Sequence, residues 1–274
     1  MISVIVPVRN SIAWLEQVVD ALLAQDYPRD GYEIILVDNG SSDGSREWLA
    51  GRSGIRVLDE PERGSYAARN RGLRHARGDI LAFTDSDCFA EPGWLSAIAE
   101  GFRAARVQVL LGPRFSVGPS RAARLLADYE NHRVETICAM DDPAPYFGYT
   151  NNMAVRSAAM ERCGPFQQRQ RGADTLLLQK VLADASCEAV AWCAGMAVRH
   201  AELDSAASYF RKARIYGRSH RAFREQSPVR TLRAAERWRV FRSACPPRRP
   251  LDAILLLALL TGGSLAWWAG RRGL

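Results

Sequence analysis

Four short apolar runs, separated by segments of helical length, occupy the first part of the chain and limit the folds open to it. Each run is rich in aliphatic or β-branched residues, as expected for a buried strand. The runs are Ile2–Pro7, Glu33–Asp38, Ile55–Leu58 and Asp79–Thr84. Strands that alternate with helices indicate a doubly wound, mostly parallel α/β sheet.

Two carboxylates follow the fourth apolar run directly. The stretch from Gly78 reads GDILAFTDSD, so Asp85 and Asp87 stand at the carboxyl end of a predicted buried strand. In open α/β sheets, ligands bind at that end of the strands. Paired carboxylates hold a divalent cation, and the cation in turn holds a diphosphate. Because an isolated Asp-x-Asp is common by chance, the position after the strand is what predicts a site for a divalent cation.

Two nucleotide-binding signatures are missing from the sequence. The first strand is followed by a Pro-Val-Arg-Asn loop instead of Gly-x-Gly-x-x-Gly, which argues against a dinucleotide-binding dehydrogenase. The two lysines, Lys180 and Lys212, do not follow a glycine, so the sequence contains no Walker lysine. We therefore expect metal and arginine to bind phosphate.

Six motifs, in their order and spacing, resemble family 2 of the inverting nucleotide-sugar glycosyltransferases, which have a GT-A fold. They are VIVPVRN (4–10), ILVDNGSSDG (35–44), ARNRG (68–72), DSD (85–87) and, less strictly, NNMAVR (151–156) and GADT (172–175). The resemblance covers roughly the first 200 residues and is more specific than any one motif. It implies a metal-dependent hexosyltransferase, with a GT-A catalytic domain over residues 1–204.

The resemblance also implies which residues bind the nucleotide sugar. The loop after the first strand and the carboxylate of Asp38 hold the base; a carboxylate accepts a hydrogen bond from the imide N–H of uracil, which favours a UDP-sugar. Arg69 contacts the phosphate or the sugar; the alternative is that Arg69 lies on a solvated face of its helix and binds no ligand. The full predicted set is Pro7, Val8, Arg9, Asn10, Asp38, Arg69, Asn70, Asp85 and Ser86.

For the metal, the resemblance implies that Asp87 is a direct ligand. Asp85 reaches the metal or the ribose. His200 follows the predicted strand Met196–Arg199 and offers a further metal or diphosphate ligand, while a structural histidine is the alternative. The resemblance implies that this metal is Mg²⁺ or Mn²⁺, acting as a Lewis acid that neutralises the departing diphosphate.

Asp174 matches the catalytic base of the family. It follows a glycine at the start of a predicted helix, where the helix dipole favours the ionised carboxylate. An inverting transfer needs such a base to remove the proton of the acceptor hydroxyl. A simple N-cap role is the alternative. Ala173 stands where the family usually has glutamate, which puts acceptor positioning in question.

The positive charge of the chain is concentrated in one segment. Residues 1–198 carry 21 Lys and Arg against 25 Asp and Glu, whereas residues 199–249 carry 14 against 4. Within 205–249, Ser205–Phe223 and Thr231–Phe241 read as basic amphipathic helices, which favour an anionic membrane surface. The sequence contains no nucleic-acid-binding motif, so we expect no nucleic acid partner. Solvated, arginine-rich helices packed on the body are the alternative.

Residues 250–274 form an apolar tail. Leu251–Gly270 contains one charged residue, Asp252, and 20 helical residues span about 30 Å, the thickness of a bilayer core. Tryptophans and arginines follow at the end of the run, as in an interfacial belt. The tail therefore predicts one membrane segment, although Thr261–Ser264 leaves an interfacial arrangement open. The basic flank on its N-terminal side keeps the catalytic body at the cytoplasmic face, and six cysteines without a regular spacing agree with reduced thiols there.

These features predict an inverting glycosyltransferase that moves a sugar from a nucleoside diphosphate donor to a glycan or lipid-linked acceptor near the membrane, such as a precursor of a cell envelope polysaccharide. Two alternatives stay open. One is a sugar nucleotidyltransferase on a related fold, which usually needs a glycine-rich basic loop that is missing here. The other is a non-catalytic membrane protein that binds a nucleotide sugar, an option raised by Ala173.

Overall fold

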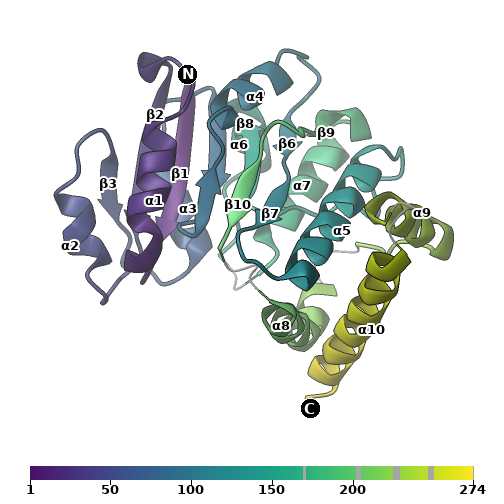
Figure 1. Cartoon of the computed structure of the whole chain (residues 1–274). Coiled ribbons are helices and arrows are strands. Elements are labelled where there is room, and N and C mark those ends of the chain that lie inside the picture. The colour runs from purple at the N-terminus through teal and green to yellow at the C-terminus, as the bar shows by residue number, and fades with distance from the viewer. Residues whose placement is uncertain (169–170, 202–204, 225–228, 246–249, 274) are drawn as a thin grey trace. The chain divides into compact units, whose positions relative to one another are not determined.

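The computed structural model describes residues 1–168, 171–201, 205–224, 229–245 and 250–273. The chain divides into two compact units (Figure 1). Unit 1 contains Met1–Pro113 and Phe147–Arg199, and unit 2 contains Arg114–Tyr146 and His200–Leu274. Each is described by itself below.

Unit 1 is built on a seven-stranded sheet with the order β3-β2-β1-β4-β8-β6-β9. β8 is antiparallel to both of its neighbours, and the other neighbouring strands are parallel. The strands are β1 Ile2–Val8, β2 Tyr32–Asp38, β3 Arg56–Asp59, β4 Ile80–Thr84, β6 Val109–Leu111, β8 Asn152–Arg156 and β9 Val190–Trp192. The predicted mostly parallel α/β sheet is therefore confirmed.

The central strands are buried on both faces because helices cover the sheet. In β2 every residue is buried, and in β1 only Pro7 is partly exposed. The helices of unit 1 are α1 Ile12–Leu23, α2 Ser45–Ala50, α3 Ser65–Leu73, α4 Trp94–Gly101, α6 Ser157–Cys163 and α7 Ala173–Asp184, with short 3₁₀ turns at Arg29–Gly31 and Cys187–Ala189. α3 approaches β1 closely, since a Cβ on Gly72 would lie 2.5 Å from Cγ2 of Ile5. This contact fixes the helix that carries the ARNRG motif.

Two short strands that the sequence did not predict as such border the site. β5 (Cys88–Ala90) begins directly after the DSD motif, and β10 (Val198–His200) is its neighbour in a second, smaller sheet. Strands of three residues are too short to show a hydrophobic period. β10 ends at His200, so the strand predicted at Met196–Arg199 is shifted along the chain by one or two residues.

Unit 2 is mainly helical. Its elements are β7 Arg114–Ser116, α5 Arg121–Cys138, α8 Ala206–Arg224, α9 Ala234–Ala244 and α10 Pro250–Arg272. From the sequence alone, Gly112–Tyr149 contains prolines and reads as irregular, with a helical section near Ala122–Arg133. In the structure this section is the longer helix α5, which has 18 residues. Ser120 caps it, since its hydroxyl accepts a hydrogen bond from the amide of Ala123 at 3.3 Å. α8 packs along α10, and α5 packs on α9 (Figure 1).

Candidate active site at the carboxyl edge of the sheet

The loops after β1, β2 and β4 are joined by hydrogen bonds at one edge of the sheet. The hydroxyls of Ser11 and Ser86 lie 2.7 Å apart. The amide of Asn10 donates to the hydroxyl of Ser41 at 3.0 Å, and the amide of Ser42 donates to Oδ1 of Asn10 at 2.8 Å. Asn10 has a φ of 51°, a left-handed conformation that asparagine tolerates better than most residues. Side chains far apart in the sequence thus meet at the edge where parallel strands place their ligands.

The residues predicted to bind the nucleobase of the donor lie at this edge. Val8 and Asp38 end β1 and β2 and are partners in register. Asp38 is buried, and both of its carboxylate oxygens lie 3.4 Å from the amide of Ser41. Arg9 and Asn10 are exposed beyond the strand end. The structure therefore brings the predicted residues of the first two motifs together.

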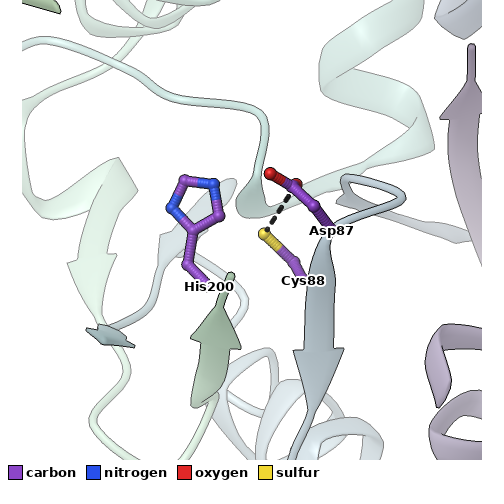
Figure 2. Close-up of side chains that lie close together, drawn as sticks. All are labelled: Asp87, Cys88 and His200. Carbon is purple, nitrogen blue, oxygen red and sulfur yellow. Dashed lines mark hydrogen bonds between the residues drawn. The ribbon is translucent and has the colours of Figure 1, made fainter. Parts of the chain in front are cut away.

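The two carboxylates of the DSD motif have different partners. Asp85 forms an ion pair with the guanidinium of Arg69, whereas Asp87 lies beside Cys88 and His200 (Figure 2). The potential ligand atoms of Asp87, Cys88 and His200 all lie within 4.8 Å of one another. His200 is the last residue of β10, and Cys88 begins the neighbouring strand β5.

The donor atoms of this cluster suit one kind of metal ion. Carboxylate oxygen and imidazole nitrogen are ligands for Mn²⁺, whereas a thiol suits softer ions. The thiol of Cys88 instead donates a long hydrogen bond to Oδ1 of Asp87, with sulfur and oxygen 3.7 Å apart. The pair Asp87 and His200 therefore fits a hard or borderline divalent cation, with Cys88 as a neighbour that orients the carboxylate.

Arg69 is buried inside the site. Only 3% of the residue is exposed, which excludes a solvated helix face. One guanidinium nitrogen donates to Asp85, and the ring of Tyr66 lies 5.6 Å from the guanidinium carbon. Nε is buried and makes no hydrogen bond within the part of the chain that is described. A buried cation with an unused donor suits an anionic ligand.

Asp174 lies in the first turn of α7, and the segment around Gly148 holds that turn in place. A Cβ on Gly148 would lie 2.7 Å from the carbonyl oxygen of Asp174, so only glycine allows this approach. The amide of Gly148 donates to the hydroxyl of Thr175 at 3.2 Å. The N-cap residue is Gly172, so Asp174 is not the N-cap that the alternative interpretation required. Ala173 is buried beside it.

Burial raises the pKa of Asp174, and its neighbours oppose this shift only in part. The amide of Thr175, the charge of Arg69 and a hydrogen bond from Tyr66 each favour the carboxylate, but desolvation is the larger effect. The helix N-terminus was expected to favour the ionised carboxylate; burial opposes that effect, and the net shift of the pKa is upward. Asp174 as a whole residue is partly exposed to solvent, but its carboxyl group is enclosed by protein atoms. A raised pKa makes Asp174 a stronger base once it is deprotonated.

Sequence reasoning missed Tyr66, which lies beside the predicted base. Burial, together with the negative charge of Asp174, raises the pKa of the Tyr66 hydroxyl above its usual value. The hydroxyl therefore stays protonated and donates to the carboxylate. Tyr66 stands just before the ARNRG motif, but no pattern in a single sequence separates it from an ordinary core aromatic residue.

Two asparagines of the recognised motifs have structural partners. The side-chain amide of Asn70 donates to the carbonyl of Phe166 at 2.8 Å and accepts from its amide at 3.0 Å. Asn39 donates to the carbonyls of Glu60 and Glu62 and accepts from the amide of Gly64. Asn39 thus fixes the entry into α3. The sugar-binding role of Asn70 stays a prediction, and both ends of its amide are already engaged.

The first testable consequence concerns the hydrogen bond from Tyr66 to Asp174. Tyr66→Phe removes a donor that favours the carboxylate, so we expect the pKa of Asp174 to rise further. A base acts only when deprotonated, and the acidic limb of the pH–rate profile should therefore move to higher pH. Measuring kcat/KM against pH for both forms tests this. Tyr129→Phe, on α5 in unit 2, is the control and should leave the limb in place.

Comparisons with known proteins agree with these observations in sequence and in fold. A glycosyltransferase of Haloferax volcanii, AglE, is 33% identical over 172 residues, which cover 60% of this chain and 55% of that protein. The glycosyltransferase GlyG of Streptococcus pneumoniae is 30% identical over 125 residues, covering 44% of this chain and 41% of that protein. The chain thus spans about half the length of the curated relatives it matches.

Solved structures share the fold. The mannosyltransferase PcManGT of Pyrobaculum calidifontis, in complex with GDP-Man and Mn²⁺, superposes with a TM-score of 0.63 at 23% identity, over 99% of this chain and 82% of that chain. TarS of S. aureus in complex with UDP gives a TM-score of 0.57 at 17% identity, over 100% of this chain and 92% of that chain. The glucosyl-3-phosphoglycerate synthase of Mycobacterium tuberculosis, with Mn²⁺, UDP-glucose and glycerol 3-phosphate, gives a TM-score of 0.51 at 23% identity. The match covers 73% of this chain and 72% of that chain.

The sequence profile of glycosyl transferase family 2 matches residues 3–169. The matched segment holds the strands, loops and carboxylates that form the sheet edge, up to the DSD motif and β8. Asp174 and His200 lie beyond it. The chain belongs to glycosyl transferase family 2.

Proposed function

We propose that this glycosyltransferase is a metal-dependent, inverting hexosyltransferase that uses a nucleoside diphosphate sugar, with UDP as the nucleotide. The observation that carries the proposal is the pair of sites built from one loop: Asp85 with the buried Arg69, and Asp87 with His200. The carboxylates of this loop lie against a buried arginine of α3 and beside a candidate cation site, so a diphosphate could be held from two sides. In this proposal residues 1–204 are catalytic, 205–249 form a basic helical segment and 250–274 a membrane-associated tail.

Donor binding is assigned to the joined loops at the sheet edge. Pro7, Val8, Arg9 and Asn10 surround the base together with Asp38, whose acceptor-only carboxylate suits uracil. Solved neighbours with related folds hold UDP or UDP-glucose in two cases and GDP-Man in a third. We choose uridine on the chemistry of Asp38, with Ser86 supporting the loop through its contact to Ser11.

Asp87 and His200, with Asp85 nearby, would hold Mg²⁺ or Mn²⁺. When bound, such an ion neutralises charge on the departing diphosphate as a Lewis acid. Arg69 supplies a second positive charge from inside the protein. Because the guanidinium is buried and already fixed by Asp85, little reorganisation is needed when the phosphate arrives.

Asp174 would remove the proton from the acceptor hydroxyl. The hydroxyl oxygen attacks the anomeric carbon on the face opposite the leaving diphosphate, which inverts the configuration. Tyr66 and the amide of Thr175 orient the carboxylate by hydrogen bonds. The charge of Arg69 acts on Asp174, so the residue assigned to the phosphate also favours the ionised form of the catalytic base.

We place the acceptor at the cytoplasmic face of a membrane, as a glycan or a lipid-linked sugar. α10 is the one helix among the described residues that is long and apolar enough to cross a bilayer. Exposed arginines of α8 and α9, among them Arg211, Arg218 and Arg242, suit an anionic lipid surface. We propose no nucleic acid partner.

Thermal shift against a panel of nucleotide sugars, with and without Mn²⁺, tests donor choice. We expect UDP-sugars to raise the melting temperature only when the metal is present, since a ligand that binds the native state stabilises it. A shift with GDP-sugars alone would contradict the uridine assignment. Turnover of a nucleoside triphosphate with a sugar 1-phosphate would identify a nucleotidyltransferase instead.

A further inference from the structure

α10 has two opposite faces along its whole length. The outward face is largely apolar and exposed, with the polar, exposed Thr261 midway between Leu257 and Leu265. Its most exposed apolar members are spaced by three residues on either side of that gap. They are Leu251, Ile254, Leu257, Leu265 and Trp268, with exposed fractions of 68%, 67%, 60%, 64% and 43%. The inward face holds the buried residues Asp252, Leu256, Leu259, Gly263 and Gly270. In the most apolar 18-residue window only 22% of the helix is buried, so α10 is not a core helix.

The inward face is bound to polar helices at both ends. Near the start, the carboxylate of Asp252 accepts from Nε of Arg121 on α5 at 2.7 Å, and this carboxylate is almost wholly buried. Near the end, α10 meets α8 at backbone contact. A Cβ on Gly270 would lie 2.0 Å from the carbonyl oxygen of Arg214, and one on Gly217 would lie 2.0 Å from that of Trp267.

The contacts with α8 lie in the second half of α10. Gly263 lies under the ring of Tyr209, and Gly262 under that of Phe210. If α10 crossed a bilayer from the side where Pro250 enters it, this half would reach the far leaflet. α8 would have to follow, and it exposes Arg211, Arg214 and Arg218. Arginines surrounded by lipid chains are costly, so a spanning α10 is incompatible with the α8–α10 pair.

We infer that α10 does not span the membrane but lies in its plane, with the outward face in an anionic lipid surface. An amphipathic helix of this kind buries its apolar side about 5–10 Å into the boundary between headgroups and acyl chains. Arg271 and Arg272 stack on Trp267 and Trp268 at 5.8 and 3.9 Å, which suits the headgroup region. This inference rests on the proposed membrane attachment and is independent of the sugar-transfer chemistry.

Membrane topology tests the inference directly. The full chain with an epitope after Leu274 is expressed in cells, and sealed inside-out and right-side-out membrane vesicles are treated with trypsin. We expect the epitope and the catalytic body to be digested in the same vesicle orientation. If the epitope is protected where the body is digested, α10 spans and the inference is wrong. If the chain is absent from the membranes, both the attachment and the inference fail, whereas transferase activity is unaffected.

Vesicle binding tests the outward face separately. Ile254→Asp combined with Leu265→Asp should weaken binding to phosphatidylcholine–phosphatidylglycerol vesicles by roughly a factor of ten or more. Each substitution places a charged carboxylate on the face that would otherwise be buried at the boundary between headgroups and acyl chains. The control is Ser53→Asp, an exposed position in unit 1. The inward face is unchanged in all variants, and the melting temperature checks their folding. Unchanged vesicle binding, or a dimer in solution that the double variant dissociates, would show that lipid does not cover this face.

Discussion

Asp174→Asn is expected to lower turnover by roughly 10²-fold or more while donor affinity stays nearly constant. Loss of a general base typically costs between about 10² and 10⁴ in rate. Asparagine keeps the shape of the side chain, and its Oδ1 can still accept the hydrogen bond from the amide of Thr175, so the geometry of the first turn of α7 should persist. The change therefore isolates proton removal from positioning.

Steady-state kinetics and donor calorimetry on the same preparations measure this split. Asp184→Asn is the matched control, because Asp184 ends the same helix and pairs with Arg162 at the surface. It should retain full activity. If Asp174→Asn keeps more than about half of the rate, the carboxylate is not the base and only orders the helix start.

The same substitution has an expected effect on stability. The folded-state pKa of Asp174 is raised, so the folded protein binds the proton more tightly than the unfolded chain does. Stability from this group is therefore present at low pH and is lost as the pH rises through the folded-state pKa. A neutral asparagine avoids that loss. We expect Asp174→Asn to melt no lower than the unmodified protein at neutral pH, as found when an active site gives up stability for function.

Asp87→Ala is expected to abolish metal-dependent donor binding and leave the fold intact. Asp87 supplies the carboxylate of the cluster with His200, and loss of a direct ligand removes most of the affinity of a two-residue site. Calorimetry with Mn²⁺ and a UDP-sugar should show at least a roughly 10²-fold weaker complex. Unchanged affinity would remove Asp87 from the site.

Two controls make the metal experiment specific. Asp79→Ala removes an exposed carboxylate that pairs with the N-terminal amine. Asp79 lies just before the start of β4, at the end of the strand away from the DSD motif, so this change should not affect donor binding. Cys88→Ala tests whether the thiol is a ligand. Because Mn²⁺ and Mg²⁺ prefer oxygen and nitrogen to thiol sulfur, we expect Cys88→Ala to change Mn²⁺ affinity little. Strong loss in this variant would point to a softer metal.

The sheet was predictable because its strands are fully buried. Runs such as Ile2–Pro7 and Glu33–Asp38 have nearly continuous apolar character, and β1 and β2 extend over them with only small changes at the ends. The short strand β5 was not predictable, since three residues carry no period. α5 was predicted too short, because it lies in a region where Pro and Gly on either side suggested irregular structure.

The site was predictable where residues act through their place at a strand end, and not where they act through neighbours. Asp85 and Asp87 follow β4, as expected, but their separate partners Arg69 and His200 depend on tertiary contacts. The raised pKa of Asp174 has the same origin: enclosure by side chains outweighs the helix terminus, and enclosure cannot be read from the local sequence. The apolar tail likewise passed the length test for a span, while its packing on α8 appears only in the structure.

Release of UDP from a UDP-sugar is the most direct measurement of the proposed chemistry. The full chain is assayed with membranes as the acceptor, with Mn²⁺ or with a chelator, beside Asp87→Ala and Asp174→Asn. We predict release that requires the metal, is lost in Asp87→Ala and falls roughly 10²-fold or more in Asp174→Asn. Donor binding without any release would instead identify a non-catalytic binding protein, and release that is equal with chelator or in both variants would contradict the assignment of this site.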